Sequence, residues 1–163
     1  MNYYEDVTPE SAIVKALGER GLTLFIAESC TGGLVCKLIT DVSGASRVLL
    51  GGVVSYVNDI KMNILGVSPD TIDTYTEVSE QCAAEMAEGA RRISGAHIGL
   101  STTGYASAGT GVPCDMVGVV YIGISDKYGT SVYRLQLEGD RESVRLEAAN
   151  ELLSTLLARI EAY

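Results

Sequence analysis

Apolar residues in this chain form short continuous runs, and these runs are separated by segments with helical spacing. Continuous runs of large and β-branched residues are typical of strands that are buried on both faces of a sheet. Four segments have this character, and a fifth alternates between apolar and polar residues, as a more exposed strand does. The predicted strands cover 22–27, 48–57, 97–103, 117–125 and 130–138.

Capping residues mark where helices begin between these strands. Thr8 before Pro9 combines an N-cap side chain with a proline at the first helical position, and "SPDTI" repeats this signal. Ser79 precedes an amphipathic segment that ends before Gly95. The first predicted helix begins at 8–10 and closes at Gly18 and Gly21, and the others cover 31–39, 59–65 with Asn58 as N-cap, 68–72, 79–93 and 139–160.

This order of elements favours an α/β fold, a three-layer α/β/α sandwich with a mostly parallel central sheet. Only "DKYG" (126–129) separates the last two strands, so we expect them to form a hairpin and make the sheet mixed. A length of 163 residues suits one domain, and residues 1–163 are assigned to it.

Charge and composition exclude several classes of partner. The net charge of −9 disfavours binding to a nucleic-acid backbone, although helix N-termini and a few basic groups can still hold a small anion. No apolar run is long enough to cross a bilayer, and "MNYYEDVTPE" lacks the apolar core of a secretion signal. Four cysteines without zinc spacing and a single histidine argue against a metal site. We therefore expect a cytoplasmic protein.

Three polar or glycine-containing segments follow predicted strands, namely "AESCTGG" (27–33), "SYVNDIK" (55–61) and "TTGYASAGTG" (102–111). The carboxyl ends of parallel strands meet at one edge of a sheet, so these segments predict a pocket there. The first contains three adjacent hydroxyl or thiol groups. Ser29 is the candidate nucleophile, with the N–H groups near Thr31 and Gly32 as oxyanion donors. A simple N-cap role for Ser29 explains the segment equally well.

A base is needed to activate Ser29, and the chain offers two candidates. His97 lies at the start of its strand, roughly 20 Å from the strand end where the site is expected. Lys61 lies in the first turn of the helix after "SYVN", where burial and the helix N-terminus lower the pKa of a lysine. We therefore favour a Ser-Lys pair. The alternative is a lysine on the solvated surface.

Two further polar residues belong to the predicted site. Tyr56 either assists proton transfer or packs on the sheet. Arg141 opens the last helix, and its guanidinium fork suits phosphate or carboxylate. The alternative for Arg141 is an ion pair with the neighbouring Asp140 or Glu142.

Taken together, "AESCTGG", "GGVVSYVNDIK", "TTG" with "VGVVYIG" after it, and "GDRESVR" resemble the CinA carboxy-terminal domain family over residues 8–160. The resemblance implies hydrolysis of nicotinamide mononucleotide (NMN) to nicotinate mononucleotide and ammonia, without a metal or organic cofactor, by a homo-oligomer. It implies catalytic roles for Ser29, Lys61 and Tyr56. The substrate-binding residues implied are Thr31, Gly32, Gly33, Asn58, Thr103, Gly104 and Arg141.

One loop, residues 107–116, departs from the family pattern. Ser107 and Ala108 stand where the family has Gly-Pro, and Asp115 and Met116 stand where it has Lys-Pro. Exchanging a lysine for an aspartate reverses the local charge and would repel an anionic substrate. Two alternatives follow: a deamidase with a different substrate, or a non-catalytic nucleotide-binding or assembly domain with the same fold.

Overall fold

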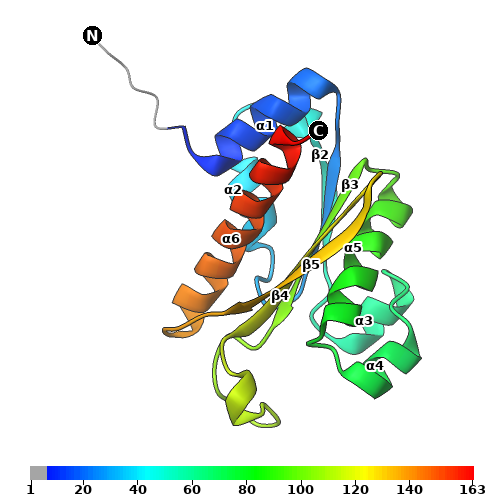
Figure 1. Ribbon diagram of the computed structural model, residues 1–163, viewed down its shortest axis with the longest axis vertical. Helices are drawn as coiled ribbons and strands as arrows, with labels where there is room; N and C mark the ends of the chain where they lie inside the picture. Colours follow the sequence, from blue (N-terminus) through cyan, green and yellow to red (C-terminus); the bar gives the residue numbers. More distant parts are fainter. Residues whose placement is uncertain (1–6) are drawn as a thin grey trace.

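A five-stranded mixed sheet forms the centre of the computed structural model, which describes residues 7–163 (Figure 1). The order in space is β2-β1-β3-β4-β5, with β1 (Leu24–Glu28), β2 (Leu49–Val54), β3 (Ile98–Gly104), β4 (Val119–Asp126) and β5 (Gly129–Gln136). The first three strands are parallel, and β4 runs antiparallel to both β3 and β5. The sheet and the β4–β5 hairpin are therefore as predicted. Residues 1–6, which carry most of the expectation about a secretion signal, lie outside the described residues.

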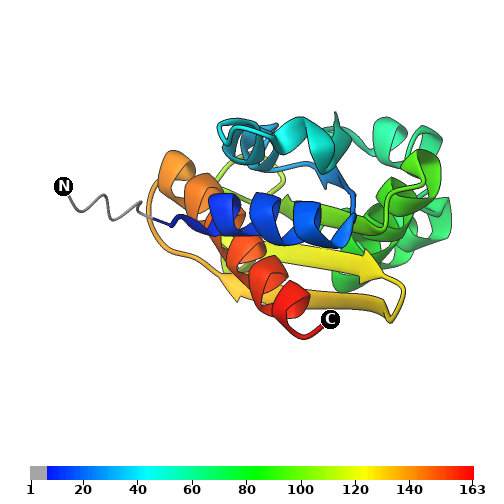
Figure 2. The same ribbon diagram turned by 90° about the horizontal axis from the view of Figure 1, so that it is seen from above.

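Helices cover both faces of the sheet (Figures 1 and 2). One face packs against α1 (Pro9–Arg20), α2 (Leu34–Thr40) and α6 (Arg141–Glu161). The other packs against α5 (Glu80–Ser94), and the short α3 (Asn58–Asn63) and α4 (Pro69–Tyr75) lie beside it. Short 3₁₀ turns occur at Ala45–Arg47 and Cys114–Met116. The three-layer α/β/α sandwich is confirmed.

The two layers of helices enclose separate apolar cores. The larger core joins α1, α2 and α6 to the sheet, and strand residues such as Ile26 and Leu100 are fully buried in it. The smaller core lies under α5, around Met86 and Leu65. Burial of these side chains is the dominant force that holds the strand ends of the pocket in place.

Helix boundaries differ from the predictions at two points near the pocket. The helix predicted over 31–39 begins at Leu34, because Gly32 (φ 58°) and Gly33 (φ 102°) adopt left-handed backbone conformations that end the turn before it. The N-cap of α3 is Val57, and Asn58 is already helical. The caps predicted at Thr8 and Ser79 are confirmed, because each side chain accepts a backbone N–H of the following turn.

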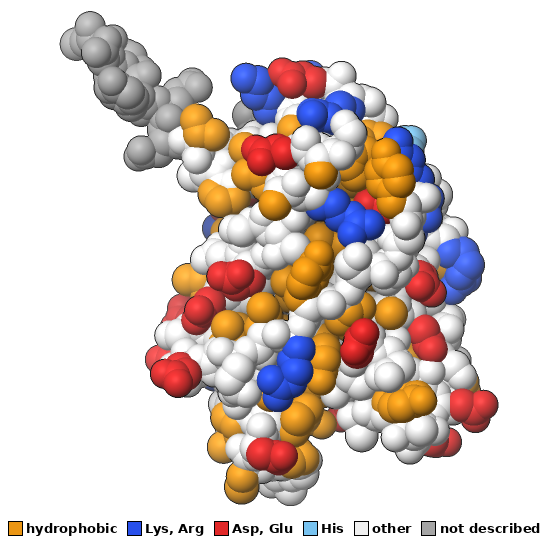
Figure 3. Space-filling view, viewed as in Figure 1, with side chains coloured by type: hydrophobic (Ala, Val, Ile, Leu, Met, Phe, Trp, Pro, Cys, Tyr) orange, Lys and Arg blue, Asp and Glu red, His pale blue; other side chains and the backbone are white. Residues whose placement is uncertain are grey.

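Apolar side chains run down the middle of one face, between α6 and α5, and charged groups lie to both sides (Figure 3). The exposed aromatic residues Tyr128 and Tyr133 belong to the β4–β5 hairpin that lies there. No helix formed by residues 7–163 has the length and apolar character that a membrane span requires.

An ion pair at the far end of the sheet from the pocket predicts how stability depends on pH. Burial raises the pKa of Asp126, but hydrogen bonds from Arg159 outweigh it and bring the value to about 2. Stability from this pair is present above the unfolded pKa of about 3.9 and is lost as pH falls towards 2. We expect Asp126→Asn to lower the free energy of unfolding by about 2 kcal/mol at pH 7.

Urea unfolding at pH 7 and at pH 3 measures this effect, and the difference between variant and native protein should shrink at the lower pH. Asp41→Asn is the control, because Asp41 pairs with Lys37 on the surface of α2, where both side chains are exposed. Its cost should stay below about 0.5 kcal/mol. Equal costs for the two variants would contradict the prediction.

Candidate active site

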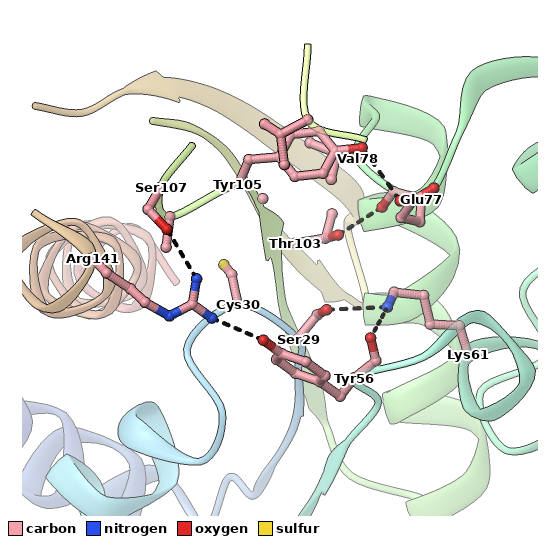
Figure 4. A pocket seen from close by; sticks show the side chains of 13 residues that line it. Ser29, Cys30, Tyr56, Lys61, Glu77, Val78, Thr103, Tyr105, Ser107 and Arg141 are labelled. Atoms are coloured by element: carbon pink, nitrogen blue, oxygen red, sulfur yellow. Dashed lines mark hydrogen bonds between the residues drawn. The ribbon is translucent and has the colours of Figure 1, made fainter. Parts of the chain in front are cut away.

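The carboxyl ends of β1, β2 and β3 meet at a pocket of about 220 Å³, as predicted from the segments that follow the strands. All three of these segments contribute side chains, and the loop after α4 and the start of α6 complete the walls (Figure 4). Within residues 7–163, the pocket is lined by Ser29, Cys30, Tyr56, Lys61, Glu77, Val78, Thr103, Gly104, Tyr105, Ala106, Ser107, Val112 and Arg141.

Ser29 and Lys61 are in direct contact in this pocket. Lys61 Nζ lies 3.0 Å from Ser29 Oγ, and it donates to the backbone carbonyl oxygens of Ser55 at 2.7 Å and Tyr56 at 3.5 Å. The Lys61 side chain is 1% exposed and Ser29 is 8% exposed. A solvated surface lysine, the alternative drawn from the sequence, is therefore excluded.

Burial lowers the pKa of the Lys61 ammonium group, and Cys82, Glu77 and Cys30 oppose that shift. Burial raises the pKa values of the Cys82 and Cys30 thiols to about 12, so neither thiol is charged near neutral pH. The carboxylate of Glu77 is thus the charged neighbour that acts on Lys61. Lys61 forms no salt bridge with any residue in the described part of the chain.

The direction of the Lys61 shift is as expected, but its cause is only partly so. Burial and a helix N-terminus are the two causes predicted from the sequence, but α3 has six residues and Lys61 is the fourth of them. Side chains in a helix point back towards its N-terminus, which brings Nζ to the carbonyl groups that precede α3. Burial of the ammonium group is the cause that lowers the pKa of Lys61.

Glu28 holds the turn that carries Ser29, a role that sequence reasoning missed. This carboxylate is 1% exposed and accepts hydrogen bonds from the Thr31 hydroxyl at 2.6 Å and from backbone N–H groups at the start of α2. The N–H donors are those of Gly33, Val35 and Cys36, at 2.8 to 3.1 Å. A carboxylate at a helix N-terminus satisfies N–H groups that lack helical partners. Glu28 therefore fixes α2 relative to the strand end.

The backbone N–H groups beside Ser29 that lack an acceptor lie one residue earlier than predicted. The Gly32 N–H donates to the carbonyl of Ser29 at 3.1 Å and is occupied. In residues 7–163, the N–H groups of Cys30 and Thr31 have no acceptor. Arg145 donates to the carbonyl oxygens of Cys30 at 3.0 Å and Thr31 at 2.9 Å, which fixes the planes of these peptides. The Cys30 and Thr31 N–H groups are thus the available donors beside Ser29.

Only one of the three adjacent candidate nucleophiles has a suitable environment. The Cys30 thiol has a pKa raised to about 12 by burial, so the reactive thiolate is scarce. Thr31 is fully buried, and its hydroxyl bonds to Glu28 and lies 2.7 Å from that of Thr102. Ser29 faces the pocket with Lys61 beside it, and Gly33, not Ser29, is the N-cap of α2. The N-cap role for Ser29 is therefore excluded.

Tyr56 and Arg141 meet at the pocket entrance. The Arg141 guanidinium donates to the Tyr56 hydroxyl at 2.8 Å and to the Ser107 hydroxyl at 3.2 Å (Figure 4). Tyr56 is 58% exposed, so it does not pack on the sheet. Arg141 forms no ion pair with Asp140 or Glu142, nor with any other acidic residue between 7 and 163. Its charge is free to meet an anion.

The end of β3 forms the opposite wall. Thr103 donates its hydroxyl to the backbone carbonyl of Glu77 at 2.6 Å, and the Tyr105 hydroxyl donates to the Glu77 carboxylate at 3.3 Å. Gly104 has no room for a side chain, because a Cβ there would lie 2.6 Å from the Val119 carbonyl oxygen. This close approach lets β4 pair up to the rim of the pocket.

Thr76, directly before Glu77, has a strained backbone. At φ 70° and ψ 171°, it is the one residue other than glycine with positive φ among those described. This region is costly for a β-branched residue. We expect Thr76→Gly to raise the free energy of unfolding by about 1 kcal/mol, the relief of strain less the entropy cost of glycine.

Thermal unfolding of the two proteins checks this expectation. Thr74→Gly is the control, because Thr74 lies inside α4 and is exposed, so glycine should destabilise the protein there by about 0.5 kcal/mol. A loss of stability in Thr76→Gly as large as in Thr74→Gly would contradict the assignment of strain.

Comparison with known proteins shows which family this chain belongs to. The CinA C-terminal domain model matches residues 6–160. A relative named competence-damage inducible protein, from Thermoanaerobacter sp. (strain X514), is 50% identical over 136 residues, 83% of this chain. This chain belongs to the CinA C-terminal domain family. It covers 33% of that relative, and thus spans about a third of the length of the curated relatives it matches.

Solved structures of CinA proteins have the same fold. A CinA superfamily protein from Klebsiella pneumoniae gives a TM-score of 0.89 at 28% identity, over 95% of this chain and 97% of that chain. The competence/damage inducible protein CihA from Agrobacterium tumefaciens gives 0.87 at 33% identity, over 97% and 98%. The agreement in fold thus extends over nearly the whole domain.

Some residues assigned to substrate binding from the CinA motifs line the pocket of this CinA domain, and others do not. Thr31, Gly32, Gly33 and Asn58 do not belong to the lining within residues 7–163, whereas Thr103, Gly104 and Arg141 do. The glycines shape the turn after Ser29, and Thr31 bonds to Glu28. A role of these four residues in substrate binding stays a prediction.

The remaining expectations concern His97, metals and loop 107–116. His97 lies at the opposite end of β3, with Nδ1 3.1 Å from the Thr23 backbone nitrogen, which agrees with a structural role. Residues 7–163 contain no cluster of three or more His, Cys, Asp or Glu side chains suited to a metal. Asp115 is exposed and does not line the pocket, so the charge reversal in loop 107–116 lies outside the pocket walls. Ser107, from the same loop, does line the pocket.

Proposed function

We propose that this CinA domain is a serine amidohydrolase that deamidates NMN by a Ser-Lys mechanism. The observation that supports the proposal is the 3.0 Å contact between Lys61 Nζ and Ser29 Oγ, both buried in one pocket. Lowering of the Lys61 pKa by burial favours the neutral amine that a general base requires. The NMN substrate itself comes from the family resemblance.

Backbone carbonyl groups orient the lysine for this task. A neutral amine carries two N–H groups and one lone pair. The carbonyl oxygens of Ser55 and Tyr56 accept the two N–H groups, which leaves the lone pair for the Ser29 hydroxyl. Lys61 is therefore held in the orientation in which it accepts the proton of Ser29.

The reaction then proceeds in two halves. Ser29 Oγ attacks the carboxamide carbon as its proton moves to Lys61 Nζ, and the N–H groups of Cys30 and Thr31 stabilise the oxyanion. Lys61 returns the proton to the amide nitrogen, the carbon–nitrogen bond breaks, and ammonia leaves. Water, deprotonated by Lys61, attacks the resulting ester, and nicotinate mononucleotide is released with Ser29 restored.

Arg141 is the group that fits the substrate phosphate. It lies across the pocket lining from the Ser-Lys pair, is free of carboxylate partners within the described residues, and presents a fork suited to phosphate oxygens. Its contact with the Tyr56 hydroxyl gives Tyr56 a role in orienting Arg141. The Tyr56 hydroxyl only accepts this hydrogen bond, so a part for Tyr56 in proton transfer stays a prediction.

The test is to incubate the purified protein with NMN and to measure ammonia and nicotinate mononucleotide in equal amounts. Rapid acid quenching and intact-mass measurement should reveal the acyl group on Ser29. The rival functions, drawn from loop 107–116, predict other results. A non-catalytic binding domain would bind NMN without releasing ammonia, and a deamidase for another substrate would release ammonia from a different amide only. The homo-oligomer stays a prediction, tested by light scattering.

A further inference from the structure

Glu77 is a charged residue in the pocket that the mechanism above does not use. Among residues 7–163, the Asp, Glu, Lys and Arg residues that line this pocket are Lys61, Glu77 and Arg141. Lys61 and Arg141 have roles in catalysis and phosphate binding. A carboxylate beside a lysine that must lose its proton works against catalysis, because it favours the ammonium form. Its presence therefore calls for another explanation.

Three contacts hold Glu77 in this position. The hydroxyl of the buried Thr103 donates to its backbone carbonyl at 2.6 Å, and the Tyr105 hydroxyl donates to its carboxylate at 3.3 Å. Ser79 donates its hydroxyl to the carbonyl of Thr76 at 2.9 Å, which fixes the residue before Glu77 in its strained conformation. Backbone strain persists where the surrounding structure enforces it, and such residues cluster at functional sites.

The pocket therefore has an acidic side and a basic side. Figure 4 shows Glu77 with Tyr105 on one side and Arg141 with Ser107 on the other, with Ser29 between them. A ligand that spans this pocket therefore lies between an acidic residue at one end and a basic residue at the other. Zwitterions with a cationic head and an anionic tail match this arrangement.

We propose that Glu77 is a specificity-determining residue that binds the positively charged ring of a zwitterionic substrate while Arg141 binds its anionic end. The inference rests on the proposed function, because it places the reacting carboxamide at Ser29. NMN has this charge pattern, since its ring is a quaternary pyridinium and its tail a phosphate. Substrates with an uncharged ring lose the contact with Glu77 and bind more weakly.

Binding to the Ser29→Ala protein, measured by calorimetry, tests the proposal without turnover. The ligands are NMN and its reduced form, which has an uncharged dihydropyridine ring but the same carboxamide, ribose and phosphate. In the Ser29→Ala background, Glu77→Gln should weaken NMN binding about tenfold and leave binding of the reduced form within about twofold. Glutamine keeps an acceptor for the Tyr105 hydroxyl, and thermal unfolding confirms that the variant is folded.

Glu80→Gln is the matched control. Glu80 is exposed at the start of α5, only three residues away, and does not line this pocket. This substitution removes the same charge from the same neighbourhood and should change NMN binding by less than about twofold. An equal effect of Glu77→Gln and Glu80→Gln would show a general field and overturn the proposal.

The remaining outcomes are also decisive. If Glu77→Gln weakens the binding of NMN and of its reduced form equally, the carboxylate accepts a ribose or amide donor and the proposal is overturned. The proposal is also overturned if Glu77→Gln does not weaken NMN binding, or if the Ser29→Ala protein does not bind NMN. Turnover separates this inference from the proposed function. If Glu77→Gln weakens NMN binding as expected but the native protein releases no ammonia from NMN, the proposed function alone is refuted. If the native protein deamidates NMN and Glu77→Gln has no effect on NMN, the inference alone is refuted.

Discussion

Replacing Ser29 with alanine should lower the rate of ammonia release from NMN by about 10⁴-fold or more. The variant keeps the pocket and the Lys61 amine but lacks the oxygen that forms the acyl-enzyme. Removal of a nucleophile from a concerted pair costs nearly the whole contribution of that pair. The measurement is steady-state ammonia release, together with a search for the acyl adduct by mass spectrometry.

Cys30→Ala serves as the control for this experiment. Cys30 is adjacent to Ser29 and lines the same pocket, but its thiol is held neutral by a pKa of about 12. Its loss should change the rate by less than about threefold, because the backbone N–H that we assign to the oxyanion remains. Loss of the acyl adduct in Cys30→Ala with its retention in Ser29→Ala would move the nucleophile to the thiol.

Fold and site location follow from short-range signals in this sequence. Continuous apolar runs specify the strands, and serine and threonine caps specify where α1 and α5 begin. Because parallel strands end at one edge, Ser29 and Lys61 are brought to a common pocket by the order of elements alone. The 3.0 Å contact between them depends in addition on where α3 turns, and spacing does not encode that.

Glu28 and Glu77 show why the remaining parts of the site escaped prediction. The donors to Glu28 are mostly backbone N–H groups, which every sequence supplies, so no side-chain pattern marks this carboxylate as a buried acceptor. Glu77 depends on contacts with Thr103 and Tyr105, which are distant in sequence. Thr76 has a positive φ that its residue type disfavours, so the residue type gives no sign of this conformation.

Removing the Lys61 amine should have an effect as large as removing Ser29. Lys61→Met is a better test than Lys61→Arg, because the fully buried site of Lys61 has no room for a larger, permanently charged group. Methionine keeps the approximate volume but takes no proton from Ser29. We expect a loss of about 10⁴-fold in the rate of ammonia release from a folded protein. Near-native turnover by folded Lys61→Met would rule out the Ser-Lys mechanism, even if Ser29 proved essential.

Two further measurements distinguish a base from a merely structural lysine. In the native protein, kcat/KM should rise with pH as Lys61 loses its proton, with a midpoint below the usual lysine pKa of about 10.4, because burial lowers that pKa. In Lys61→Ala, small primary amines should restore part of the rate, since they fit the vacated space and accept the proton. Tetramethylammonium, a cation without an exchangeable proton, should not. Equal rescue by amines and by tetramethylammonium would mean that Lys61 supplies only charge, whereas rescue by amines alone supports transfer of the Ser29 proton to nitrogen.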